Sequence, residues 1–153
     1  MSERPSHRRS SRLIETLILL ALPFLLHALF PIRTIITAPY RYAGIVVMLV
    51  GLWIANQARQ YFMEAGTTFQ LEGASQTLVT DGPFRHSRNP IYLGMLLWLL
   101  GLAIVLGSLG AFILPTVVFL LMNFVMIPME ETRMEEVGGE AYLAYRSRVR
   151  RWF

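Results

Sequence analysis

The sequence contains no cysteine and no lysine in its 153 residues. Without cysteine, the chain can form no disulfide, bind no metal through thiolates and use no cysteine nucleophile. Without lysine, all of its basic side chains are arginines. No internal repeat or low-complexity tract is evident, so we expect one domain over residues 1–153 and no metal site.

Charged residues are scarce and apolar residues are abundant. Charged side chains make up 16% of the chain and hydrophobic ones 54%, with a mean hydropathy of +0.47. The apolar residues occur in blocks rather than with the spacing of a soluble helix or strand. Roughly 20 apolar residues in a helix cross a hydrocarbon core about 30 Å thick. The pattern therefore predicts an integral membrane protein.

Four apolar blocks are candidates for membrane helices. A cleaved signal peptide is the alternative for the first block, but its length and the lack of a small-residue cleavage pattern before Pro31 favour a retained helix. A tight hairpin through Gly107 and Gly110 joins the last two blocks. We expect an all-α integral membrane fold of about four transmembrane helices, near residues 13–30, 42–62, 90–107 and 109–127.

The arginines predict how these helices are oriented. They gather in residues 1–12, from Arg59 to Arg88 and after residue 130, whereas only Arg33 and Arg41 lie in the remaining connection. By the positive-inside rule, both termini face the cytoplasm and residues 1–12 form a basic cytoplasmic arm. We expect a multi-pass protein of a prokaryotic inner membrane. The net charge of +4 thus reflects topology and does not indicate nucleic-acid binding.

Residues 130–153 are expected to form a cytoplasmic segment. Turns are predicted at Gly138 and Gly139, followed by a helix from Glu140 to Trp152. A helical wheel places four apolar or aromatic residues on one face of this helix, with arginines elsewhere. The arrangement is typical of a helix at the membrane interface. The residues of that face are Tyr142, Tyr145, Val149 and Trp152.

A first polar cluster precedes the third apolar block. Asn89 is a favoured N-cap and Pro90 a favoured first helical residue, so a helix is predicted to begin there. Its free backbone N–H groups and positive dipole end, close to Arg85 and Arg88, predict an anion-binding pocket.

A second cluster, Glu130 and Glu131, follows the fourth block. The hairpin brings this point to the same membrane face as the start of the third helix. Spacing alone favours the simpler interpretation, in which the arginines bind lipid phosphates and the glutamates are solvated or paired with them.

S-adenosylmethionine would use such a combination of groups. It needs an anion site for its carboxylate, an acceptor for its ammonium and apolar or aromatic walls for its adenine. Its sulfonium makes the methyl group electrophilic, so an enzyme mainly has to orient donor and nucleophile. A general base is needed only if the acceptor arrives protonated.

The two clusters together resemble the isoprenylcysteine carboxyl methyltransferase and phospholipid methyltransferase family. That family has Arg, His, Pro, any residue and Tyr at a helix start, then paired glutamates, then a glycine and two spaced tyrosines. The match covers roughly the C-terminal half, in order and spacing. The resemblance implies a membrane enzyme that holds S-adenosylmethionine at the cytoplasmic face, with a lipid-accessible opening. The resemblance lies in the stretch from Leu78 to Gly94, where Arg88, Asn89, Pro90, Ile91 and Tyr92 occupy the signature positions, together with Glu130, Glu131, Gly139, Tyr142, Tyr145, Val149, Arg151 and Trp152.

The resemblance also implies which residues form the site. Arg88 and Glu131 are the expected catalytic residues. Asn89 replaces the signature histidine and removes a titratable group, and Gly138 stands where an aromatic residue often precedes the glycine. His86 is interpreted as a loop histidine, with a role as base for an amine or thiol acceptor as the alternative. The expected cofactor-binding residues are Arg85, His86, Arg88, Asn89, Pro90, Tyr92, Glu130, Glu131, Tyr142, Tyr145 and Arg151.

The expected function is methyl transfer from S-adenosylmethionine to a lipidic or membrane-embedded acceptor. A prenylcysteine carboxylate, a phospholipid amine and a small hydrophobic thiol or acid all stay open, as does the oligomeric state. The alternative is a non-catalytic four-helix membrane subunit or a small transporter. A transporter places polar groups at mid-membrane, whereas here they gather at one face. His27, near the end of the first block, is interpreted as structural.

Overall fold

The computed structural model describes residues 21–29, 34–64 and 78–153, and within these ranges the secondary structure is helical, with no strand. The all-α prediction is confirmed. Residues 21–29 are helical, whereas the basic arm 1–12 and the rest of the 13–30 block lie outside the described residues. The elements are η1 (Tyr40–Tyr42), α2 (Ala43–Glu64), η2 (Gly82–Arg85), α3 (Pro90–Leu106), η3 (Leu109–Phe112), α4 (Ile113–Leu121), the π-helical η4 (Met122–Met126) and α5 (Ile127–Arg148).

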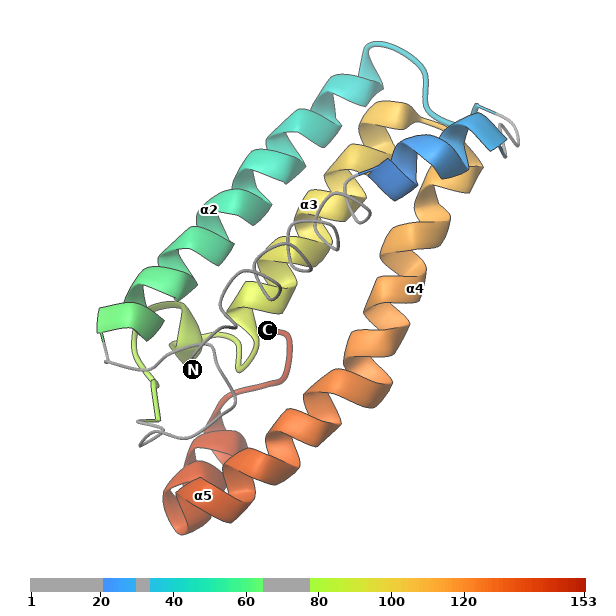
Figure 1. The fold of residues 1–153 in the computed structure, drawn as a ribbon. Helices are drawn as coiled ribbons and strands as arrows, with labels where there is room; N and C mark the ends of the chain where they lie inside the picture. Colours follow the sequence, from blue (N-terminus) through green and yellow to red (C-terminus); the bar gives the residue numbers. More distant parts are fainter. Residues whose placement is uncertain (1–20, 30–33, 65–77) are drawn as a thin grey trace, which may run out of the picture.

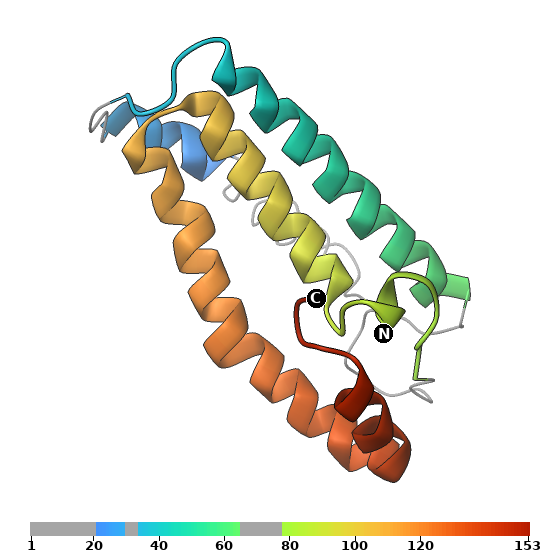
Figure 2. The same ribbon diagram turned by 180° about the vertical axis from the view of Figure 1, so that it is seen from behind.

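Helix α3 lies between α2 and the long run formed by α4, η4 and α5, as both views show (Figures 1 and 2). Two helical runs are long and apolar enough to cross a membrane, Tyr40–Glu64 and Leu109–Arg148, and the apolar α3 is shorter. Only 17% of the apolar window in the first run and 33% in the second are buried, whereas the core helix of a soluble protein would be mostly buried. A lipid environment explains this exposure, and the number of four spans stays a prediction.

Helices α2 and α3 pack through facing glycines. Gly44 lies against Gly101 and Gly51 against Gly94, and the two glycines of each helix are seven positions apart in the sequence. A Cβ added to Gly51 would come within 2.5 Å of the Gly94 carbonyl oxygen, and one added to Gly44 within 2.4 Å of the Gly101 carbonyl oxygen. Small residues of this kind let membrane helices approach closely. The contact fixes the start of α3 beside the last turns of α2.

The helix after the hairpin runs further than the sequence predicts. It was expected to end near Ile127, but it passes through Pro128 and continues to a kink at Gly139, beyond which a second helical stretch ends at Arg148. The π-helical turn Met122–Met126 precedes the proline, and its wider hydrogen-bonding pattern accommodates the N–H group that Pro128 lacks. At Gly139, with φ 51° and ψ −132°, the chain leaves helical geometry and folds back (Figure 1). The turn predicted there is confirmed.

The predicted helix from Glu140 to Trp152 is wrong at its C-terminal end. The helix ends at Arg148, and Val149 is extended with φ −115° and ψ 131°. The backbone carbonyls of Arg150 and Arg151 accept hydrogen bonds from the loop before α3, which holds this part of the chain away from helical geometry. We call residues 149–153 the C-terminal strap.

The end of the bundle where α3 terminates is held by paired polar groups. Arg41 donates from Nε to the Ile36 carbonyl (3.0 Å) and from Nη2 to the Leu106 carbonyl (2.9 Å). His27 Nδ1 lies 2.7 Å from the hydroxyl of buried Ser108. Gly107, in the left-handed region at φ 69°, turns the hairpin as predicted. The structural interpretation of His27 agrees with this contact.

Candidate functional site

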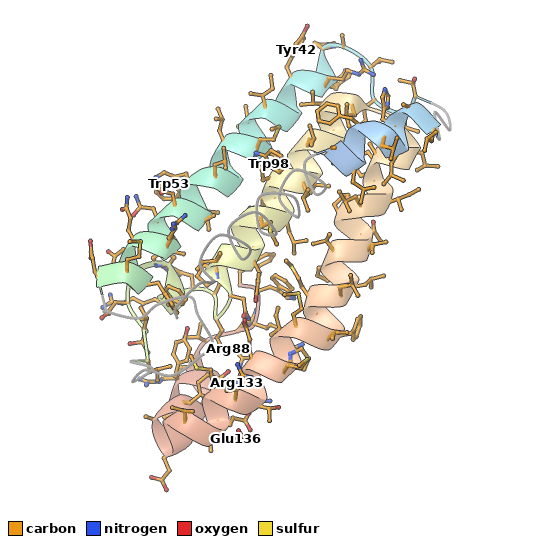
Figure 3. All side chains as sticks on the ribbon, in the orientation of Figure 1. Tyr42, Trp53, Arg88, Trp98, Arg133 and Glu136 are labelled. Carbon is orange, nitrogen blue, oxygen red and sulfur yellow. The ribbon has the colours of Figure 1, made fainter. Side chains whose placement is uncertain are left out.

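A cluster of three charged side chains, of which Arg151 is partly exposed, lies where α3 begins and α5 folds back. Glu131 accepts from Arg88 Nη2 at 3.0 Å, and from Arg151 at 2.8 Å (Nη2) and 3.2 Å (Nε). The Glu131 side chain is 8% exposed and that of Arg88 10%. Figure 3 shows Arg88 at the same end of the bundle as Arg133 and Glu136, and opposite to Tyr42. Two guanidinium groups share one carboxylate, so the cluster is positively charged.

Arg88 has hydrogen-bonding capacity that the described protein atoms leave unused. Its Nε and Nη1 are buried and have no hydrogen-bond acceptor of good geometry among the described residues. A buried donor without an acceptor costs about 1–3 kcal/mol, and native proteins therefore rarely keep one that no water or ligand satisfies. The Tyr142 hydroxyl lies close to the same guanidinium. Arg88 thus has the character of an anion-binding residue.

Glu130 is bound differently from Glu131. Its Oε1 accepts a 2.6 Å hydrogen bond from the hydroxyl of Tyr92, a buried residue of α3. Burial raises the pKa of the Glu130 carboxyl, while the Tyr92 hydrogen bond and the charge of Arg133 act to lower it. Glu131 is occupied by two arginines, whereas the second oxygen of Glu130 has no recorded protein donor among the described residues. Glu130 is therefore the better placed of the two to accept from a ligand.

Two tyrosines beyond the Gly139 bend cover the cluster. Tyr142 and Tyr145 are buried, as expected for residues on one helical face, with ring centroids 6.3 Å apart. Burial raises the pKa of the Tyr142 hydroxyl, with a further rise from Glu131 and opposing effects of Arg88 and Arg151. Burial raises the pKa of Tyr145 to about 12. The Tyr145 hydroxyl donates to the Phe84 carbonyl at 2.7 Å, which ties this helix to η2.

The loop before α3 binds the C-terminal strap. Arg88 N donates to the Arg150 carbonyl at 2.9 Å, and both Ser87 Oγ (3.2 Å) and Asn89 Nδ2 (3.1 Å) donate to the Arg151 carbonyl. Helix α3 begins at Pro90 after Asn89, as predicted, but the Asn89 side chain makes no capping hydrogen bond. Its amide is instead used to hold the strap, so the capping role expected for this side chain is wrong.

A cleft of about 840 Å³ lies on the other side of this loop. The salt bridge of Arg85 with Asp81 (2.9 Å) and the exposed His86 both belong to the cleft and not to the charged cluster. Ser87 and Pro90 flank Arg88 and Asn89 in the chain and also line the cleft. The residues that line the cleft are Trp53, Ile54, Gln57, Tyr61, Asp81, Gly82, Pro83, Arg85, His86, Ser87, Pro90, Leu93, Trp152 and Phe153.

The structure thus brings most of the expected site residues together. The charged cluster consists of Arg88, Glu131 and Arg151, and next to it lie Tyr92, Glu130 and Tyr142. Asn89 and Tyr145 are bonded to the segments that enclose the cluster. The cleft, by contrast, is lined by Arg85, His86 and Pro90. The described residues contain no group of three or more His, Asp or Glu side chains arranged to hold a metal ion.

Sequence reasoning missed Asn123. Its side-chain oxygen accepts from Trp152 Nε1 at 3.1 Å, and Arg151 Nη1 reaches its backbone carbonyl at 3.2 Å. One signal was available, because an amide side chain inside an otherwise apolar membrane block is costly unless it has a partner. The partner itself lies 28 residues further along the chain, beyond the reach of local patterns.

Comparisons with known proteins place these features in a family context. The profile of the phospholipid methyltransferase family matches residues 40–141 of the chain, from η1 to the residue before Tyr142. The chain is also similar to a protein-S-isoprenylcysteine O-methyltransferase of Schizosaccharomyces pombe, with 28% identity over 115 residues that cover 72% of this chain and 48% of that protein. The chain therefore spans about half the length of this curated relative. No solved structure matches significantly.

Proposed function

Because the chain belongs to the phospholipid methyltransferase family, we propose that it transfers a methyl group from S-adenosylmethionine to a lipidic or membrane-embedded acceptor. Family membership supports methyl transfer in general, and the cofactor and the class of acceptor are the finer steps of the proposal. The observation that carries these steps is the buried pair of unsatisfied Arg88 donors beside two glutamates.

The charged cluster fits the groups of S-adenosylmethionine. Arg88 Nε and Nη1 are two unsatisfied donors on different sides of the guanidinium group, and each can donate a charge-assisted hydrogen bond to an anionic group such as a carboxylate. The second oxygen of Glu130 is available for an ammonium or for ribose hydroxyls. Tyr142 and Tyr145 supply aromatic surface for a purine ring. When bound, the cofactor supplies an electrophilic methyl group on its sulfonium.

The residues of the chain then mainly bind, orient and exclude water. Both oxygens of Glu131 are occupied by arginines, so Glu131 acts by holding Arg88 and Arg151 in place. Arg88 is the residue proposed to contact the cofactor directly. Fixing two reactants in line can account for a large part of the rate enhancement of a displacement reaction.

The cleft is the proposed entrance for the acceptor. On its α2 side it is lined by Trp53, 64% exposed, and by Ile54, whereas Gln57 and His86 supply polar groups. This combination suits an amphipathic molecule whose apolar chain lies in the bilayer. A prenylcysteine carboxylate, a phospholipid amine and a hydrophobic thiol or acid all meet that description. His86 is the proposed base only for an acceptor that arrives protonated.

We further propose four transmembrane helices, with both termini and the site at the cytoplasmic face of a prokaryotic inner membrane. The proposal is supported by the arginine-rich ends of the chain and by the position of the polar cluster at one end of the bundle. A reporter fused before Met1 and one fused after Phe153 should both locate to the cytoplasm. A reporter inserted between Ile32 and Pro39 should locate to the opposite side. Termini on different sides would contradict the proposal.

Calorimetric titration of the detergent-purified protein with S-adenosylmethionine, and with its demethylated product, tests the cofactor. We expect saturable binding that Arg88→Gln abolishes. Arg148→Gln is the matched control, because Arg148 is an exposed arginine of α5 bonded only within its own helix among the described contacts. Folded protein that binds neither compound would contradict the proposal and favour a non-catalytic membrane subunit. Transfer of a labelled methyl group to a membrane lipid extract then tests the acceptor class.

A further inference from the structure

Asn123 lies in the π-helical turn between α4 and α5, where its backbone carbonyl has no helical partner. In an α-helix this carbonyl would accept from the N–H of Ile127, but Ile127 N donates to Met122 O instead. In a π-helix it would accept from residue 128, which is a proline and has no N–H. The sequence Asn123 to Pro128 thus creates a free acceptor inside an apolar helix.

The C-terminal strap takes up this acceptor. Arg151 Nη1 donates to the Asn123 carbonyl at 3.2 Å and lies 3.4 Å from its side-chain oxygen, which also accepts from Trp152 Nε1 at 3.1 Å. The Trp152 ring packs on Phe119, with centroids 5.5 Å apart, and against the buried group of Tyr92, Met122 and Ile127. Every recorded side-chain bond of Asn123 therefore goes to the strap.

The same strap residues serve both parts of the proposed site. Arg151 forms the two-bond ion pair with Glu131, and Glu131 in turn binds Arg88. Trp152 lines the cleft. Releasing the strap from Asn123 would loosen one wall of the cleft and remove the arginine that shares Glu131 with Arg88.

We infer that Asn123 is a positioning residue, which fixes the C-terminal strap so that Arg151 and Trp152 complete the cofactor and acceptor regions. This inference rests on the proposed function for its effect on binding. The contribution of Asn123 to fastening the strap follows from its contacts with Arg151 and Trp152 and can be tested without any ligand.

Trp152 fluorescence tests the fastening. The chain has three tryptophans, so Trp53→Phe with Trp98→Phe leaves Trp152 as the sole emitter. In this background, Asn123→Leu keeps the size but removes the side-chain acceptor. We expect red-shifted emission and severalfold stronger quenching by acrylamide. Asn123→Asp retains an acceptor oxygen and should emit like the parent. Emission and quenching that stay at the parent values in Asn123→Leu would overturn the inference.

Cofactor affinity, measured with the tryptophans intact, tests the positioning. Asn123→Leu should bind S-adenosylmethionine roughly tenfold more weakly, the effect expected from losing one or two hydrogen bonds. Asn123→Asp should restore most of the affinity. Thr116→Val is the matched control, since Thr116 lies in α4 and its exposed hydroxyl bonds only to the Phe112 carbonyl. A released strap with unchanged affinity would overturn the positioning role.

Two further outcomes can be told apart. If Asn123→Leu does not fold, Asn123→Ala and Trp152→Phe weaken the same contact more mildly and should both lower affinity; normal affinity in both would overturn the inference. If the folded wild-type protein binds no cofactor, the proposed function fails. The fluorescence experiment then still decides whether Asn123 fastens the strap.

Discussion

An arginine side chain lies at each end of α3: Arg41 of η1 at the C-terminal end and Arg88, just before the helix, at the N-terminal end. The two side chains make different kinds of contact. Arg41 donates to the carbonyls of Ile36 and Leu106 and so completes the C-terminal end of the helix. Arg88, at the N-terminal end, is buried with two donors that no described protein atom accepts. Arg41 thus uses its donors on backbone carbonyls of the chain, whereas Arg88 keeps two donors that the proposed ligand could use.

Replacing Arg88 should give the largest effect and sharpen this contrast. Arg88→Met fills a similar volume and removes donors that the protein alone does not satisfy. We expect cofactor affinity to fall by about 3 kcal/mol or more, because two hydrogen bonds to a charged group are lost. Thermal stability should change much less, since Glu131 keeps Arg151. Titration calorimetry and thermal unfolding measure the two quantities. A loss of stability without loss of affinity would make Arg88 a structural residue like Arg41.

Glu131→Gln should have the next largest effect. It keeps the shape of the side chain but removes the charge that holds Arg88 and Arg151, so affinity should fall by about 1.5–3 kcal/mol. Glu130→Gln tests the other glutamate, which has one recorded protein bond and a free oxygen. Near-normal cofactor affinity in both folded variants would count decisively against a cofactor role for the pair.

Arg41→Met probes the opposite end of α3. The carbonyls of Ile36 and Leu106 would lose their charged donor, and we expect the free energy of unfolding to fall by about 2 kcal/mol. Cofactor affinity should remain at the wild-type value. Chemical or thermal unfolding in detergent, followed by circular dichroism, provides the measurement. Weaker cofactor binding in an Arg41→Met variant of normal stability would contradict the difference in role between Arg41 and Arg88. It would show that the C-terminal end of α3 affects the cofactor site at the other end.

Asn89 should show the smallest effect. If it were only a cap, Asp would replace it without loss, because both accept from the first helical turn. Here Asn89 Nδ2 donates to the Arg151 carbonyl, which Asp cannot do. We expect Asn89→Asp to lose about 1 kcal/mol of cofactor affinity and Asn89→His, which keeps a donor, to lose less. Full affinity for Asp together with a loss for His would contradict the strap-holding role.

The parts of the molecule that depend on neighbouring residues could be predicted from the sequence. The start of α3 at Pro90, the hairpin turn at Gly107 and the shared face of Tyr142 and Tyr145 all follow from local backbone preference or helical spacing. The proximity of Glu131 to Arg88 could also be predicted from the sequence, because a tight hairpin fixes which ends of two helices lie together.

The parts that depend on distant partners could not be predicted. The apolar block predicted a helix end near residue 127, but the π-helical turn before Pro128 allowed the helix to continue. The strap has a helical pattern, yet its carbonyls are bound by a loop more than 60 residues away in the sequence. Arg85 and Arg88 are three residues apart and face different regions, because η2 ends between them.

The glycine contacts between α2 and α3 have a consequence for how deep the site lies in the membrane. The two contacts, Gly44 with Gly101 and Gly51 with Gly94, are two helical turns apart. Sliding one helix along the other by a single residue would bring a side chain against a backbone carbonyl at both positions. If α2 spans a membrane as proposed, these contacts fix the height of Pro90 and of the mouth of the cleft relative to the residues of α2 that face the lipid.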